Sequence, residues 1–395
     1  MRPTTPPHTL SGKAFILNQL KHPDEVIWLR HIYGNAFHLV GVFCPEDVRF
    51  QYLHVARSIP EEDAKKLIAR DKGEEFRYGQ QVTETFQHAD VFVDLQGYDA
   101  VSVEDARSQL QRYLDLLFGH KTISPTREEY GMFLAQSSAL RTADLSRQVG
   151  ASILTTAGEV VSVGTNEVPA PGGGQYWHGP NAVRDIELQK DENTKIKFEN
   201  LEEVIAALTD DWDSKSDRVK KRILDSAAKK LDSTRWMNLT EFSRAVHAEM
   251  DAVLAAGRIG VSVRGCELYC TTFPCHNCCK HIVNAGISRV QYIEPYPKSL
   301  AERLHSDAIL LGTRDTGDSR VAFEPFRGIA PRMYGTLFST MTPVGKRIKR
   351  KNDLGDADLT PAGLRVKSSP WSYIEREALA VDVIMSVVPP RNDVV

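Results

Sequence analysis

Long hydrophobic runs are absent from this 395-residue sequence. No apolar stretch approaches the roughly 18 residues that a membrane-spanning helix requires. The first twenty residues contain prolines and scattered polar side chains, without the apolar core of a secretory signal. We therefore expect a cytoplasmic protein that has no membrane contact.

A large excess of charge of one sign is also absent. The 49 Lys and Arg residues nearly balance the 52 Asp and Glu residues, which gives a net charge of -3. This balance argues against a protein that coats nucleic acid, and we expect no stable DNA complex. A small anionic substrate held by a few arginines is compatible with it. The length suffices for two domains, each with its own core.

Cysteines are few, and they are unevenly placed. The six are Cys44, Cys266, Cys270, Cys275, Cys278 and Cys279. A disulfide framework would spread them along the chain, whereas five of six in one short segment favour metal binding. Only Cys275 and Cys278 have the two-residue spacer of a zinc pair. We expect the others to be small core residues.

A glycine-rich phosphate-binding loop is missing from residues 1–125, which otherwise read as an α/β domain. Apolar runs at 37–43 and 91–95 predict buried strands, and 22–34 and 103–118 predict helices. The segment resembles part of a P-loop kinase domain, for example in WLRHIYG (28–34), but lacks the Walker A loop. It would serve as a scaffold or oligomerisation module, or as a sensor that holds a nucleotide or a phage component.

Residues 126–340 predict a second domain, a three-layer α/β/α sandwich. Thr126 to Glu129 has the pattern of a helix cap, and 152–164 that of a β-hairpin. A helix after residue 247, a strand at 267–273 and a helix after residue 275 follow. The charged stretch at about 180–240 predicts a helical insertion. We interpret residues 341–395 as a tail with a basic run, most simply a solvated one, and a final helix.

The residues between His247 and Cys278 carry the chemistry. His247-Ala248-Glu249 is followed by Pro274-Cys275-His276-Asn277-Cys278. Cys275 and Cys278 share one face at the first turn of a helix, where the helix dipole favours thiolates. With His247 they make three ligands for a catalytic Zn²⁺, and water takes the fourth position. Glu249 is then the proton shuttle.

The order H-x-E and then P-C-x-x-C is similar to that of zinc nucleobase deaminases. More widely, residues 126–340 resemble the deoxycytidylate deaminase family of the cytidine deaminase superfamily. The resemblance rests on LSRQVGA (145–151), VGTN (163–166) and ISRVQYIEPY (287–296). It implies that Asn166 contacts the sugar and that Arg147 contacts the phosphate. A structural salt bridge is the alternative role for Arg147.

The two-domain layout resembles that of anti-phage deaminases. It implies deamination of dCTP or dCMP, which would deplete cytosine nucleotides in phage-infected bacteria. It also implies a homo-oligomer, and restraint by a small RNA, a protein antitoxin or allosteric nucleotides.

Two other functions are compatible with the motifs. One is a tRNA or single-stranded DNA nucleobase deaminase, although such enzymes usually carry basic, aromatic surfaces. The other is a non-catalytic nucleotide-binding regulator with a structural zinc, against which the intact Glu249 speaks.

Overall fold

The computed structural model describes residues 13–72, 80–232, 234, 236–296, 299–312, 317–342, 345–365 and 370–387. They form two compact units. The first contains the described parts of Met1–Phe133, Tyr292–Pro295 and Pro325–Val395, and the second those of Leu134–Gln291 and Tyr296–Glu324. Both units combine a sheet with helices, which confirms the α/β class. The division of function at residue 125 and the kinase-like assignment stay predictions.

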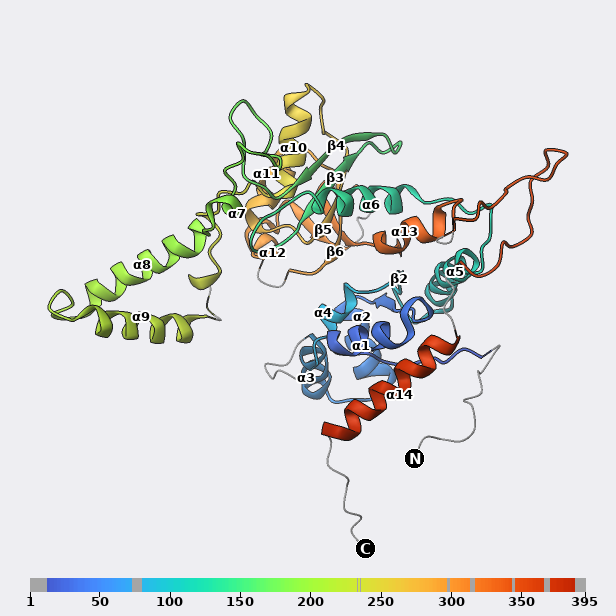
Figure 1. The fold of residues 1–395 in the computed structure, drawn as a ribbon, viewed down its shortest axis with the longest axis horizontal. Coiled ribbons are helices and arrows are strands. Elements are labelled where there is room, and N and C mark those ends of the chain that lie inside the picture. The colour runs from blue at the N-terminus through green and yellow to red at the C-terminus, as the bar shows by residue number, and fades with distance from the viewer. Residues whose placement is uncertain are drawn as a thin grey trace, which may run out of the picture. The chain divides into compact units, whose positions relative to one another are not determined.

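The first unit contains a sheet in the order β1-β2-β9. β1 (Val40–Phe43) runs parallel to β2 (Val91–Asp94), and β9 (Gly328–Ile329) is antiparallel to β2. β1 is shorter than the predicted run at 37–43. The helices of this unit are α1 (Pro23–Tyr33), α2 (Glu46–Gln51), α3 (Glu61–Lys72), α4 (Val82–Phe86), α5 (Ala100–Leu117), the start of α6 (Arg127–Ala139), α13 (Pro331–Phe338) and α14 (Pro370–Val387). Figure 1 labels β2 and the helices α1 to α5 of this unit.

The start of α6 shows how a local pattern becomes a tertiary anchor. The Thr126 hydroxyl accepts the Glu129 N–H at 3.2 Å, and the Glu129 carboxylate accepts the Thr126 N–H at 2.8 Å. This is the reciprocal cap that the sequence predicts. The same carboxylate also accepts two bonds from Arg112 of α5 and one from the Ile329 N–H of β9. Glu129 therefore ties α5, α6 and β9 together.

The second unit contains a sheet in the order β4-β3-β5-β6-β8-β7. β3 (Gly150–Leu154) is antiparallel to both β4 (Val160–Thr165) and β5 (Glu267–Thr272), and β7 (Ile309–Leu311) is parallel to β8 (Val321–Pro325). β6 is Arg289–Glu294. The helices are the rest of α6, α7 (Asp185–Leu188), α8 (Glu192–Leu208), α9 (Asp217–Leu231), α10 (Ala248–Arg258), α11 (His276–Ala285) and α12 (Ala301–His305).

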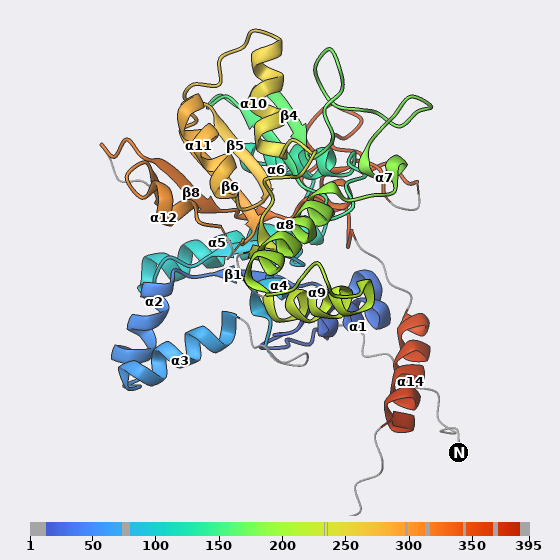
Figure 2. The same ribbon diagram turned by 90° about the vertical axis from the view of Figure 1, so that its left-hand side faces the viewer.

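Helices pack on both faces of this sheet, as expected for three layers (Figure 2). Gly150 and Gly164 are one residue out of register in the β3–β4 pair, so they lie on opposite faces. A Cβ at Gly150 would lie 1.9 Å from the Ala135 oxygen of α6. A Cβ at Gly164 would lie 2.2 Å from the Ala248 oxygen of α10. Glycine at each position thus permits close approach of a helix, and α10 is the helix that follows His247.

The elements after α12 differ most from the sequence prediction. The sequence has no clear hydrophobic period between residues 306 and 340, yet β7, β8, β9 and α13 lie there. The strands have three, five and two residues, too short for hydrophobic alternation to be recognised. In the predicted insertion α8 packs against α9, and α14 includes the predicted final helix. Among the described residues, no helix combines the length and apolar character needed to cross a membrane.

Candidate active site

His247 and Cys275 occupy equivalent positions at the starts of two helices that pack together. His247 is the N-cap of α10, and Cys275 is the N-cap of α11. Both residues have extended backbones, with ψ of 151° and 165°. Cys278 lies in the first turn of α11 and is fully buried. The two helix starts therefore bring one imidazole and two sulfurs to one place.

The three donor atoms have a spacing that suits a zinc ion. His247 Nδ1 lies 3.4 Å from Cys275 Sγ and 3.3 Å from Cys278 Sγ, and all three atoms lie within 4.8 Å of one another. Tetrahedral zinc with ordinary Zn–S and Zn–N bonds separates such donors by about 3.6 Å. The donor types and their distances therefore fit zinc. Among the described residues these three are the group of His, Cys, Asp and Glu side chains so arranged.

The three donor side chains shift one another's pKa values. The pKa of Cys275 falls to about 3, first because the Cys278 thiol hydrogen-bonds to its sulfur and then because His247 does. The hydrogen bond to Cys275 raises the pKa of the Cys278 thiol. The hydrogen bond between Cys275 and the His247 ring raises the pKa of His247 to about 9. A thiolate next to a cationic ring at two helix N-termini is the environment in which cysteine binds metal.

Glu249 lies beside this group without belonging to it. Its side chain is 4% exposed, and burial raises the pKa of its carboxyl group. The carboxyl group hydrogen-bonds with the thiol of Cys278, which connects it to the donor group. A carboxyl group that holds its proton more tightly than usual is suited to accept and return protons near neutral pH.

Asn166 and Arg147, predicted to bind substrate, are connected to each other. The Asn166 amide accepts the Val149 N–H at 2.8 Å and donates to the Arg147 carbonyl at 2.7 Å. Asn166 therefore shapes the loop that carries Arg147. The amide has a further N–H and lone pair, so its contact with a sugar stays a prediction. The Arg147 guanidinium lies 6.0 Å from the centre of the Tyr296 ring.

Sequence reasoning missed three residues near the site. We expected Cys270 to be an ordinary core residue, but its thiol hydrogen-bonds to Glu249, and complete burial raises its pKa well above the usual value. The Asp144 carboxylate accepts the N–H groups of Ser146 and Arg147 at 2.8 and 3.2 Å. Tyr296 lies in the run ISRVQYIEPY, but only the 6.0 Å between its ring centre and the Arg147 guanidinium gives it a role to test.

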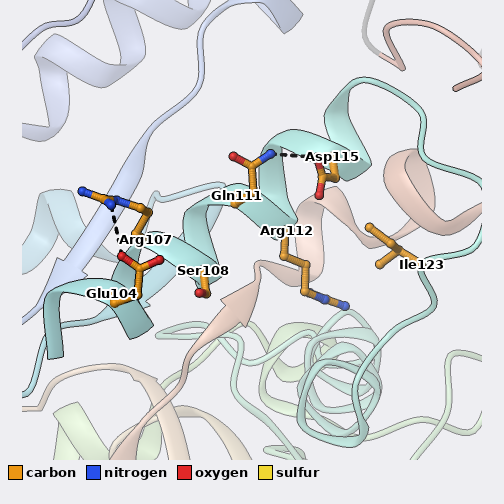
Figure 3. Close-up of a pocket in the computed structure, with 7 residues that line it drawn as sticks. All are labelled: Glu104, Arg107, Ser108, Gln111, Arg112, Asp115 and Ile123. Carbon is orange, nitrogen blue, oxygen red and sulfur yellow. Dashed lines mark hydrogen bonds and ion pairs between the residues drawn. The ribbon is translucent and has the colours of Figure 1, made fainter. Parts of the chain in front are cut away.

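A surface groove of about 360 Å³ lies in the first unit, away from these residues in the sequence. It follows α5 and is lined by Glu104, Arg107, Ser108, Gln111, Arg112, Asp115 and Ile123 (Figure 3). Its side chains are paired: Arg107 with Glu104, Gln111 with Asp115, and Arg112 with Glu129. Because these charged and polar side chains are paired within the protein, we assign no functional site to this groove.

Comparison with known proteins supports the chemistry of the second unit. The sequence model described as the cytidine and deoxycytidylate deaminase zinc-binding region matches residues 125–294. The deoxycytidylate deaminase of Enterobacteria phage T2 is 30% identical over 154 residues, which are 39% of this chain and 72% of that protein. The ComE operon protein 2 of Bacillus subtilis (strain 168) is 48% identical over 54 residues, which are 14% of this chain.

Coverage of other relatives is lower. The chain spans 29% of the ComE operon protein and 63% of the deoxycytidylate deaminase of Mus musculus, which is 28% identical over 165 residues. Among solved structures, the dCMP deaminase of cyanophage S-TIM5 is similar over 52% of this chain and 100% of its own, with 17% identity and a TM-score of 0.28. That score is too low to support an argument about this chain.

Proposed function

The chain belongs to the deoxycytidylate deaminase family, and from this premise we propose that it deaminates free deoxycytidine nucleotides. The products would be the deoxyuridine nucleotide and ammonia. The observation that carries the proposal is the convergence of His247, Cys275 and Cys278 on one point beside the buried Glu249. Zinc is the metal of this family's matched region, and the donor set fits it.

We assign His247 Nδ1 and the sulfurs of Cys275 and Cys278 as the ligands. Zinc held there would supply Lewis acidity that makes a water molecule acidic near neutral pH. The protein contributes thiolates stabilised at the start of α11 and an imidazole fixed at the start of α10. The Cys275 sulfur already has thiolate character without an ion, because neighbouring groups donate hydrogen bonds to it.

Glu249 is the proton carrier in this proposal. Its carboxylate accepts a proton from the attacking water and passes it to N3 of the cytosine ring as the oxygen bonds to C4. It then accepts the proton of the new C4 hydroxyl group and gives it to the exocyclic amine, which leaves as ammonia when the C4–N bond breaks. Burial raises the pKa of the carboxyl group, and this effect outweighs the hydrogen bond from the Cys278 thiol, which lowers it. A single group that accepts and donates within one turnover works best with a pKa near the operating pH.

Arg147 and Asn166 hold the part of the nucleotide that does not react. A guanidinium can bind a phosphate through two parallel hydrogen bonds. The Asn166 amide positions the backbone of Arg147 and keeps bonding capacity for a sugar hydroxyl. The Tyr296 ring centre lies 6.0 Å from the Arg147 guanidinium, so we assign this ring a place beside the bound nucleotide.

A panel of substrates tests the proposal. Purified protein would be incubated with dCMP, dCTP, CTP, adenosine and a single-stranded oligonucleotide, with and without a zinc chelator, and ammonia release measured. We expect product from dCMP or dCTP alone, lost with the chelator and regained with added zinc. Release from adenosine or the oligonucleotide alone would make the protein a nucleobase deaminase of another kind. Release from none would favour a regulator with a structural zinc.

We extend the proposal to a role in antiviral defence, in which the enzyme depletes cytosine nucleotides in phage-infected bacteria. The enzyme would act as an oligomer under the control of a small RNA, a protein antitoxin or nucleotides. Plaque counts on cells that express the wild type or Glu249→Gln test this role. Equal counts would leave a deaminase of ordinary nucleotide metabolism.

A further inference from the structure

We propose that Gln175 and Asp251 are positioning residues for the nucleotide. Together they fix the end of β4 at Thr165, and through it they hold Asn166 and the loop that carries Arg147. The role in nucleotide binding rests on the proposed function, because it presupposes that the protein binds a deoxycytidine nucleotide. The contacts that support it are all within the second unit.

Thr165 is held at both sides of its backbone by side chains from distant parts of the chain. Its N–H donates to Asp251 Oδ2 of α10 at 3.3 Å, and its carbonyl accepts from Gln175 Nε2 at 2.6 Å. Thr165 is 1% exposed, and Gln175 and Asp251 are each 6% exposed. Water cannot replace these partners easily, so losing one leaves a buried backbone group without a hydrogen bond.

The orientation of the Gln175 amide is itself fixed. Arg141 Nη1 donates to Gln175 Oε1 at 2.6 Å, which leaves the amide nitrogen to face the Thr165 carbonyl. A glutamate here would face that carbonyl with a second acceptor. On the other side, Arg258 Nη2 lies 3.5 Å from Asp251 Oδ1.

The position of Thr165 reaches the substrate residues through Asn166. The Asn166 N–H donates to the Val149 carbonyl at 3.2 Å, and its side chain binds the N–H of Val149 and the carbonyl of Arg147. These three hydrogen bonds join the end of β4 to this loop. A shift of Thr165 therefore moves Arg147, the residue proposed to hold the phosphate.

The network and the metal group are held by different side-chain contacts, and the substitutions below leave in place the backbone bond from the Asp251 N–H to the His247 carbonyl. Asp251 and Gln175 contact Thr165, Arg141 and Arg258, whereas His247, Cys275 and Cys278 contact one another. Loss of the network should therefore weaken substrate binding more than it slows the chemical step. In kinetic terms KM rises while kcat changes little.

Two matched pairs of variants test this. Asp251→Asn keeps an oxygen that can accept the Thr165 N–H, and Asp251→Ala removes it. Gln175→Met keeps the shape without the amide, and Gln175→Glu reverses the bonding. For dCMP we expect KM to rise about tenfold in Asp251→Ala and in both Gln175 variants, with kcat and bound zinc within about twofold of wild type. Asp251→Asn should stay near wild type. An unchanged KM in Asp251→Ala, or a joint loss of kcat and zinc, overturns the inference.

A measurement without turnover separates this inference from the proposed function. Amide hydrogen exchange at Val149, whose N–H binds Asn166, should quicken in Asp251→Ala and Gln175→Met but not in Asp251→Asn. If wild type releases no ammonia from dCMP or dCTP, the proposed function fails and exchange alone decides the network. Equal protection of Val149 in all four proteins would then overturn it.

Discussion

Glu129 and Glu249 are both buried, and their surroundings differ. Glu129 is 0% exposed and accepts four hydrogen bonds, two from Arg112 and two from backbone N–H groups. Glu249 is 4% exposed and lies next to the thiols of Cys270 and Cys278 and the His247 ring. A carboxylate that accepts four hydrogen bonds is held in one orientation. One with weak thiol donors can still exchange a proton, and that difference separates a structural site from a chemical one.

The sharpest test of this contrast is Glu249→Gln. Glutamine has nearly the same shape but cannot carry the proton, so we expect kcat to fall about 10³-fold, equivalent to about 4 kcal/mol. The melting temperature should stay close to wild type, because the substitution removes no strong ion pair. Ammonia release and thermal unfolding measure the two effects. Turnover at the wild-type rate would show that Glu249 is not the proton carrier.

Glu129→Gln should give the opposite result. The amide cannot satisfy both Arg112 and the backbone donors, and we expect the free energy of unfolding to fall by about 3 kcal/mol. The protein that stays folded should keep wild-type kcat, because Glu129 belongs to the first unit. Urea unfolding followed by circular dichroism measures the loss. A variant as stable as wild type would mean that the four hydrogen bonds of Glu129 only compensate for the removal of its carboxylate from water.

These two residues also show what could be predicted from sequence. The roles of Glu249 and its neighbours were proposed from spacing, because ligands one helical turn apart must share a face. For Glu129, the cap with Thr126 was equally local. Its other partners are 17 and 200 residues away, and no local pattern indicates such contacts. The link between Asn166 and the Arg147 loop was missed for the same reason, since it depends on a side-chain orientation set by tertiary packing.

Removal of the metal with a chelator tests the same difference between the second unit, which contains the zinc ligands, and the first unit. Chelation should abolish deamination and lower the melting temperature of the second unit, because a bound ion stabilises the folded form by mass action. We expect the first unit, which includes Glu129 and Arg112, to unfold as before. Calorimetry with and without added zinc checks both parts. A uniform shift of all unfolding transitions would show that the units unfold together.

Two glycines, Gly164 packed against α10 and Gly257 within it, extend the contrast to packing. Gly164→Ala places a methyl group 2.2 Å from the Ala248 oxygen, and we expect a loss of about 2 kcal/mol and disturbance of the helix that follows His247. Gly257→Ala, within α10, meets nothing within 4 Å and should add about 0.5 to 1 kcal/mol through helix propensity. Both changes add one methyl group. Changes of opposite sign in the free energy of unfolding, measured with urea, would therefore show the effect of close packing at Gly164. Equal changes in the free energy of unfolding for the two variants would contradict the close approach of α10 to Gly164.

The smallest effect is expected where a charge pair is exposed. Lys195 Nζ lies 3.7 Å from Glu199 on α8, and the two side chains are 60% and 54% exposed. Water already solvates both charges, so Lys195→Ala should change the free energy of unfolding by at most about 0.5 kcal/mol, less at high salt. The pair formed by Arg112 and the buried Glu129 has the same formal charges, with an expected effect several times larger. A loss of equal size at both sites would show that burial does not decide what an ion pair contributes, and would remove the physical basis for distinguishing Glu129 from Glu249.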